Sequence, residues 1–144
     1  MTEFWNRLVP ELAVRDFEKA KVFYQQIFGF RLCFERPEDR FAYFDLNGAQ
    51  VMILQAQPDD LYQLREDTPR GRGLHFQIEV DDVAPVLQRV LAANLALAKP
   101  LFDCWYRVDD VEHGSREFFV HDGDGYLFRF YQALGERPAA TLGR

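Results

Sequence analysis

Cysteine, basic charge and long apolar runs are all scarce in this chain of 144 residues. Its 2 cysteines, Cys33 and Cys104, cannot build a disulfide framework. The chain has 17 Lys and Arg residues against 23 Asp and Glu, and a net charge of −6 is unsuited to nucleic acid. No apolar stretch approaches the roughly 20 residues of a membrane helix, and residues 1–5 lack the pattern of a secretory signal. We therefore expect a cytoplasmic protein that binds neither nucleic acid nor membranes.

Apolar residues, in contrast, are plentiful, and their spacing predicts the secondary structure. Hydrophobic residues make up 48 % of the chain and aromatic residues 15 %, which is enough apolar surface to offset chain entropy. In the first half, alternation predicts strands at 7–14, 30–35, 41–46 and 50–55, and a helix at 17–28. In the second half it predicts strands at 74–80, 95–101, 115–120 and 126–131, and a helix at 83–94. Residues 59–65 predict a short helix and residues 102–114 a loop.

The two halves repeat one another. Leu12, Val14 and Asp16 have the same spacing as Ile78, Val80 and Asp82, and each Asp is placed to cap the helix that follows. The chain is therefore expected to be α+β, a single domain over 1–144 made of two strand–helix–three-strand modules. We place the modules at about 7–56 and 73–132, the linker at 57–72 and a loose C-terminal tail at 133–144.

This doubled unit resembles the vicinal oxygen chelate superfamily, which includes glyoxalases, extradiol dioxygenases, fosfomycin resistance enzymes and bleomycin resistance proteins. The pattern is most similar to the bleomycin resistance proteins. The residues that carry the resemblance are 12–17, Phe23 and Tyr24, 28–30, 114–118 and 122–125. It implies that each module curls into a half-barrel and that two modules face each other around a cavity.

The resemblance also implies where a metal would bind in an enzyme of this superfamily. Four side chains hold the metal there, one from the first and one from the last strand of each module. The matching residues here are Val9, Ile53, His75 and Arg129. Only His75 can ligate, Arg129 would repel a cation, and one imidazole does not make a metal site. We therefore expect no metal, no cofactor and no catalytic residue.

A rival interpretation keeps an enzyme possible. His75, His113, His121 and Glu117 could converge in a metal site outside the family pattern, although nothing in their spacing requires them to meet. The protein would then be a divergent metal-dependent lyase, dioxygenase or thiol transferase. A third alternative is an interaction domain whose groove is filled by protein.

Strand alternation predicts which side chains line the cavity. With the four metal positions facing inward, the inward set also includes Glu11, Gln55, Gln77, Glu79, Leu127 and Tyr131. The expected core set is Leu8, Leu12, Met52, Leu54, Phe76, Ile78, Val80, Phe128 and Phe130. Polar residues facing inward indicate either a ligand-holding groove or an internal salt bridge of Glu11 or Glu79 with Arg129.

Aromatic residues in the predicted loops and hairpins supply stacking surfaces for a planar or cationic ligand, or for a dimer partner. In bleomycin resistance proteins a cationic drug is held unmodified in a groove at the dimer interface. The resemblance thus implies a homodimer that sequesters a small molecule of the bleomycin type. The expected ligand-binding residues are Phe34, Phe41, Gln55, Tyr62, His75, Gln77, Trp105, His113 and Arg129. His113 stands where the family often has Trp, and Trp105 is a candidate substitute.

Overall fold

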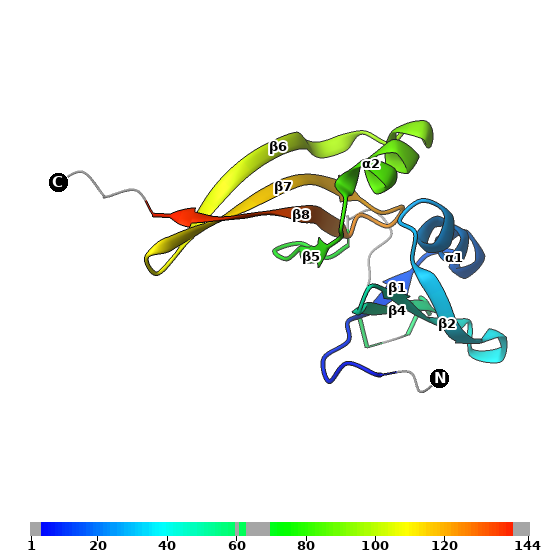
Figure 1. Ribbon diagram of the computed structural model, residues 1–144. Helices are drawn as coiled ribbons and strands as arrows, with labels where there is room; N and C mark the ends of the chain where they lie inside the picture. The colour runs from blue at the N-terminus through cyan, green and yellow to red at the C-terminus, as the bar shows by residue number, and fades with distance from the viewer. Residues whose placement is uncertain (1–3, 60, 63–69, 140–144) are drawn as a thin grey trace.

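Two strand–helix–strand–strand–strand units build the protein, as the repeat predicts. The computed structural model describes residues 4–59, 61–62 and 70–139. The first unit comprises β1 (Glu11–Val14), α1 (Phe17–Gln26), β2 (Arg31–Arg36), the short 3-10 helix η1 (Pro37–Asp39), β3 (Phe41–Leu46) and β4 (Ala49–Gln55). The second comprises β5 (Phe76–Glu79), α2 (Val83–Ala92), β6 (Leu97–Val108), β7 (Val111–His121) and β8 (Leu127–Pro138). Figure 1 shows the two units joined near their helices.

Each unit forms a four-stranded sheet, and the two sheets have the same topology. The strand order is β1-β4-β3-β2 in the first and β5-β8-β7-β6 in the second. In both, the first strand pairs in parallel with the last, and the remaining pairs are antiparallel. Asp16 and Asp82 cap the two helices, because their carboxylates accept from the Lys19 and Ala84 backbone N–H groups.

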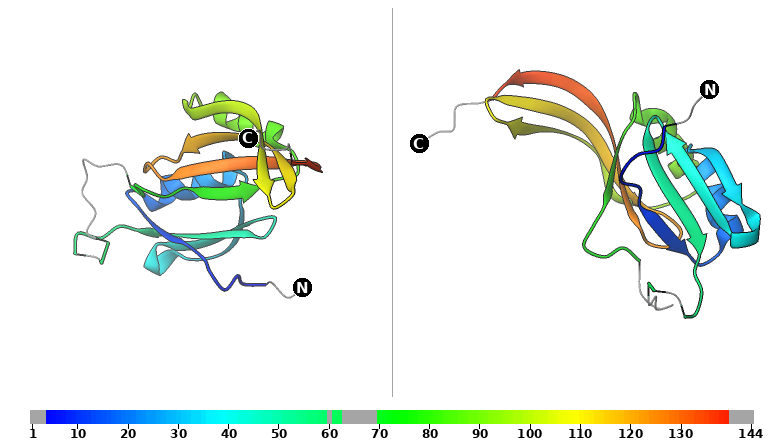
Figure 2. Two further views of the ribbon diagram at one scale, coloured as in Figure 1. Left: turned by 90° about the vertical axis from the view of Figure 1, so that its left-hand side faces the viewer. Right: turned by 90° about the horizontal axis from the view of Figure 1, so that it is seen from below.

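The second sheet is longer than the sequence predicted. Residues 102–114 were expected to be a loop, but β6 continues to Val108 and β7 begins at Val111, so this stretch is a hairpin. In the turn of this hairpin Asp109 has a left-handed φ of 56°. Few residues other than glycine adopt this conformation, but Asp does so more readily than most. Likewise β8 extends through 133–138, which were expected to be a loose tail. Figures 1 and 2 show β6, β7 and β8 curving away from the rest of the molecule.

One hydrophobic core spans both units. The rings of Tyr24, in the last turns of α1, and of Phe28, just after that helix, pack against Phe128 and Phe130 of β8, with centroids 4.8–5.8 Å apart. All four side chains are almost completely buried. Aromatic rings of this size bury more apolar surface than other side chains, so this cluster contributes strongly to holding the units together.

The turn between β7 and β8 forms a polar joint to the first unit. Tyr24 Oη donates to Asp122 Oδ2 at 2.6 Å, and Tyr126 Oη donates to the Ala13 carbonyl at 2.9 Å. The Arg15 backbone N–H donates to Asp124 Oδ1 at 2.8 Å. These bonds are made by groups that burial would otherwise leave unsatisfied, so they fix the position of one unit on the other.

The strand faces differ in part from the expectation. Leu8, expected in the core, is 86 % exposed, because β1 begins only at Glu11. In β4, Val51 and Ile53 face the core while Met52 and Leu54 face the other side, one residue out of register with the prediction. The expected core positions Leu12, Ile78, Val80, Phe128 and Phe130 are buried, and Phe76 packs against them.

Most of the predicted helix at 59–65 lies outside the described residues. Its described members, Asp59, Leu61 and Tyr62, are in turns. Among the residues that the structure describes, no helix is long and apolar enough to cross a membrane.

Candidate functional site

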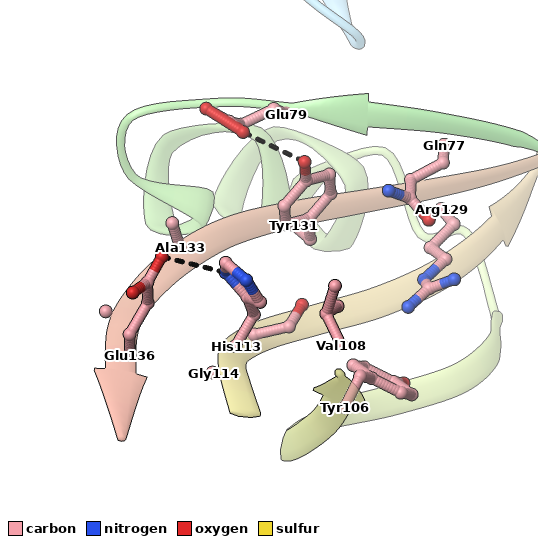
Figure 3. Close-up of a pocket in the computed structure, with 12 residues that line it drawn as sticks. Gln77, Glu79, Tyr106, Val108, His113, Gly114, Arg129, Tyr131, Ala133 and Glu136 are labelled. Carbon is pink, nitrogen blue, oxygen red and sulfur yellow. Dashed lines mark hydrogen bonds and ion pairs between the residues drawn. The ribbon is translucent and has the colours of Figure 1, made fainter. Parts of the chain in front are cut away.

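A pocket of about 620 Å³ lies on one face of the second sheet, opposite the core (Figure 3). All four strands of the sheet contribute to it, so its side chains are placed by strand alternation rather than by loops. It is lined by Gln77 and Glu79 of β5, Tyr106 and Val108 of β6, His113, Gly114 and Ser115 of β7, and Arg129, Tyr131, Ala133, Gly135 and Glu136 of β8.

The inner end of the pocket is organised by one buried carboxylate. Glu117 is completely buried, and its Oε1 accepts a hydrogen bond from Tyr106 Oη at 2.6 Å. Its Oε2 accepts from Ser115 Oγ at 2.7 Å and from Arg129 Nη2 at 2.7 Å and Nε at 3.1 Å. Burial favours the neutral acid, but these hydrogen bonds and the Arg129 charge outweigh it and hold the pKa of Glu117 below its usual range. Glu117 is therefore an anion that keeps its neighbours in place.

Arg129 is the cation that this carboxylate holds. Its guanidinium carbon lies 5.3 Å from the centroid of the Tyr106 ring and 5.7 Å from that of Phe119. The Arg129 side chain pairs with Glu117 but remains 16 % exposed, and it lines the pocket. The internal salt bridge expected from the sequence does exist, but Arg129 forms it with Glu117 rather than with Glu11 or Glu79.

Acidic groups surround the wider part of the pocket. Tyr131 Oη donates to Glu79 Oε1 at 2.9 Å, and burial together with this bond raises the pKa of Tyr131. His113 Nδ1 lies 3.6 Å from Glu136 Oε1. In Figure 3 the Tyr131 ring lies between Glu79 and Arg129, with His113 and Glu136 at the opposite end from Arg129. The pocket thus combines tyrosine rings, one held cation and two partly exposed carboxylates.

The four positions that match the family's metal ligands do not fit a divalent cation. Ile53 is buried in the core, and the residue of β4 on the other face is Met52, whose thioether does not suit a hard cation. The exposed His75 ring packs edge-on against Phe119 at 5.5 Å, and Arg129 carries a positive charge.

The alternative grouping of histidines with Glu117 is not assembled either. His113 is paired with Glu136, and Glu117 with Arg129. Within residues 4–59, 61–62 and 70–139, no three His, Cys, Asp or Glu side chains are grouped so that they could hold a metal ion.

Of the nine ligand-binding residues predicted from the sequence, Gln77, His113 and Arg129 line this pocket. His75 lines a separate pocket of about 270 Å³ between the two units, which Gln77 also borders. Gln55 caps α1: it accepts from the Phe17 N–H at 2.9 Å and donates to the Arg15 carbonyl at 2.6 Å. Tyr62 lies in a turn after β4.

Phe34 and Phe41 belong to an aromatic cluster on the first sheet. Phe34 stacks on Tyr43 at 5.2 Å, Trp5 packs edge-on against both rings, and the Arg36 guanidinium lies 4.0 Å from the centroid of Phe41. This cluster is partly exposed but does not line the pocket of the second sheet.

Trp105 lies on the opposite face of the second sheet from the pocket. A Cβ atom on Gly114 would lie 2.7 Å from the Trp105 ring and 2.9 Å from Leu134, and the Arg137 guanidinium covers the ring at 4.2 Å. Tyr106, the next residue, lines the pocket instead. Tyr106 is absent from the nine expected ligand-binding residues because its segment, 102–114, was expected to be a loop. Within a strand, the alternation of Phe102, Cys104, Tyr106 and Val108 indicates its direction.

Comparison with known proteins agrees with the fold. The sequence model of the Glyoxalase/Bleomycin resistance protein/Dioxygenase superfamily matches residues 6–130. TioX from Micromonospora sp. ML1 is 28 % identical, with a TM-score of 0.65 over 90 % of this chain and 100 % of that chain. The fosfomycin resistance protein FosX from Listeria monocytogenes shares the fold at 19 % identity, with a TM-score of 0.61 over 90 % of this chain and 94 % of that chain. The chain therefore belongs to the Glyoxalase/Bleomycin resistance protein/Dioxygenase superfamily.

Proposed function

We propose that this protein sequesters a planar, cationic antibiotic of the bleomycin type in the pocket of the second sheet and leaves it chemically unchanged. The observation that carries the proposal is Arg129. It stands at a position where the family's enzymes place a metal ligand, and Glu117 holds it there in an ion pair. The remaining lining groups are suited to stacking and hydrogen bonding, which serve binding.

The charge of the pocket favours a cationic molecule. Glu117 and Arg129 neutralise each other, so Glu79 and Glu136 leave the lining negative. Tyr106 and Tyr131 add ring faces, which attract flat and cationic groups. One structural neighbour, FosX, is named as a fosfomycin resistance protein, which is in keeping with an antibiotic as the ligand. At 19 % identity its likeness to this chain is one of fold.

We further propose that the working form is a homodimer. The strands β6, β7 and β8 extend beyond the first unit (Figures 1 and 2), and the pocket residues Tyr106, Val108 and Glu136 are exposed in a single chain. A second copy placed against the pocket face of these strands would close the pocket around a ligand. It would also bury the rings of Tyr106 and Tyr131, and aromatic residues are enriched in protein interfaces.

The drug-binding proposal is tested by calorimetric titration of metal-free bleomycin against the protein and two Tyr→Ala variants. Tyr131→Ala removes a ring from the pocket, and we expect about tenfold weaker binding, the effect of losing roughly 1.4 kcal/mol of stacking. Tyr62→Ala, outside the pocket, is the matched control and is expected to bind like wild type. Binding should weaken between 0.05 M and 0.5 M salt in all three proteins, because exposed charges are screened.

Three results would contradict this proposal. The first is equal binding by wild type and Tyr131→Ala, which would place the groove elsewhere. The second is no binding by any of the three proteins. The third is a change in the mass of the drug after incubation, measured together with the divalent metal content of the protein. A modified drug would favour an enzyme.

A further inference from the structure

We infer that the pocket selects a zwitterionic ligand, with Arg129 binding its anionic group and Glu79 its cationic group. The inference rests on the proposed function, in that this pocket binds a small molecule, and it changes the ligand in one respect. The molecule carries an anionic group in addition to the cationic group that the negative lining favours. Arg129 and Glu79 thereby become the specificity-determining residues of the pocket.

Arg129 has a donor to spare. Two of its three guanidinium nitrogens, Nε and Nη2, donate to Glu117. In the part of the chain that the structure describes, the third nitrogen, Nη1, has no hydrogen-bond acceptor. The side chain is 16 % exposed and lines the pocket, so an acceptor on a ligand can reach this nitrogen.

The guanidinium is also fixed before any ligand arrives. Glu117 holds one edge, and the rings of Tyr106 and Phe119 lie near its carbon at 5.3 Å and 5.7 Å. A side chain that is already ordered loses little conformational entropy when it binds a ligand. Arginine binds carboxylate and phosphate groups better than other acceptors, so the ligand group expected here is an anion.

Glu79 supplies the opposite charge at a defined distance. In the parallel pairing of β5 with β8, Gln77 is opposite Arg129 and Glu79 is opposite Tyr131. The two charged residues are therefore offset by two positions, or about 7 Å along the strands. Glu79 Oε1 accepts from Tyr131, while Oε2 has no partner among the described residues and can accept from an ammonium group.

The Tyr131 ring separates these two charges, as Figure 3 shows. A flat ligand that stacks on this ring can place an anion at Arg129 and a cation at Glu79 simultaneously. Neither charge needs to enter a fully buried position, because Glu79 is exposed and Arg129 is partly exposed, so the desolvation cost is small.

Three small probes of one shape test the inference by ligand-observed NMR titration. They are 4-(aminomethyl)benzoate, which carries both charges at opposite ends of one ring, benzoate, which has only the anion, and benzylammonium, which has only the cation. Wild type is expected to bind the zwitterion at least tenfold more tightly than either of the others. Equal affinity for the zwitterion and benzylammonium would overturn the inference, as would no binding of any probe.

Variants assign each charge to its residue. Glu79→Gln should reduce affinity for the zwitterion about tenfold and leave benzoate unchanged, whereas Glu38→Gln makes the same charge change at an exposed site on η1 and should have no effect. The double variant Arg129→Gln/Glu117→Gln keeps the network neutral and should lose the advantage of the zwitterion over benzylammonium. If the double variant does not fold, the affinities of Glu79→Gln and the affinities of wild type for the three probes still test the inference.

The outcome is separable from that of the bleomycin titration. Bleomycin binding without a preference for the zwitterion overturns this inference alone. A zwitterion preference without bleomycin binding overturns the identity of the drug and leaves the two-ended site standing.

Discussion

Two buried carboxyl groups of this chain differ in their preference for a proton. Glu117 has four hydrogen-bond contacts that favour its anion, and its pKa is lowered. Asp122 is buried in the β7–β8 turn beside the charge of Asp124. Burial is the largest effect, and it raises the pKa of Asp122 to about 6. Hydrogen bonds from Tyr24 and from two backbone N–H groups act in the opposite direction but are outweighed. Burial therefore dominates at Asp122, and the hydrogen bonds dominate at Glu117.

At the scale of the single residue, Asp122 gives the protein a pH dependence of known sign. Because the pKa of Asp122 is about 6 in the folded protein against 3.8 for the free group, the folded state binds the proton more tightly. This stabilisation is fully present below pH 3.8 and is lost as pH rises through 6. Asp122 should thus add about 1 kcal/mol to the free energy of unfolding between pH 7 and pH 5.

Asp122→Asn should abolish this contribution, because the amide does not titrate. The measurement is urea unfolding of wild type and Asp122→Asn at pH 5, 6 and 7. The quantity compared is the difference between their free energies of unfolding at each pH. A difference that stays constant across this range would show that Asp122 does not take up a proton in the folded protein.

At the scale of the element, the β6–β7 hairpin depends on a close contact between Trp105 and Gly114. A Cβ at Gly114 would lie 2.7 Å from the Trp105 ring and 2.9 Å from Leu134, so the sheet must shift to accept it. Gly114→Ala should therefore lower the free energy of unfolding by about 1–3 kcal/mol through overpacking. The measurement is urea unfolding at fixed pH.

Gly123→Ala is the matched control for this substitution. A Cβ at Gly123 meets nothing within 4 Å and its φ is not in the left-handed region, so its effect should stay within about 0.5 kcal/mol. Equal losses in the two variants would mean that Trp105 does not pack over Gly114.

The elements also show what the sequence can predict. The repeat and both helix caps follow from local spacing and were predicted correctly, whereas the inward direction of Arg129 came from the resemblance to the superfamily. The hairpin at 102–114 was missed because charged residues such as Asp103 and Arg107 interrupt its apolar pattern. Once this stretch is a strand, alternation necessarily sends Trp105 and Tyr106 to opposite faces.

The residues of β4 alone do not predict which of its two faces is buried. Val51, Met52, Ile53 and Leu54 are all apolar, so alternation does not distinguish the two faces. The parallel pairing of Leu12 with Ile53 decides which side is buried, and it joins two segments that are far apart in the sequence. Similarly, the Glu117–Arg129 pair links neighbouring strands β7 and β8 and has no local sequence signal.

At the scale of the whole molecule, the exposed apolar residues around 4–8 form the surface that we expect the second copy to place against the pocket face of β6, β7 and β8 in the proposed homodimer. Leu8 is 86 % exposed, and Trp5 packs on the aromatic cluster of the first sheet while remaining half-exposed. Apolar surface of this kind commonly marks an interface. Light scattering at micromolar concentration should give a mass close to twice the 16.9 kDa of one chain.

A charge placed in this surface should dissociate the dimer. Leu8→Glu is expected to give a monomer, because a carboxylate in an apolar interface lacks a partner. Leu61→Glu is the control, since Leu61 is 96 % exposed and lies in the turn after β4. A monomeric wild type, or a dimer that persists in Leu8→Glu, would count against an interface at this surface.

The exposed flank of β6 has a consequence for the behaviour of the protein at high concentration. This strand forms the outer edge of the second sheet over 12 residues, long enough to seed fibrils by strand addition. Pro100 offers no N–H there, Lys99, Asp103 and Arg107 place alternating charges along it, and its pairing with β7 is interrupted twice. These features hinder the addition of further strands at this edge, so we expect the protein to resist aggregation at high concentration.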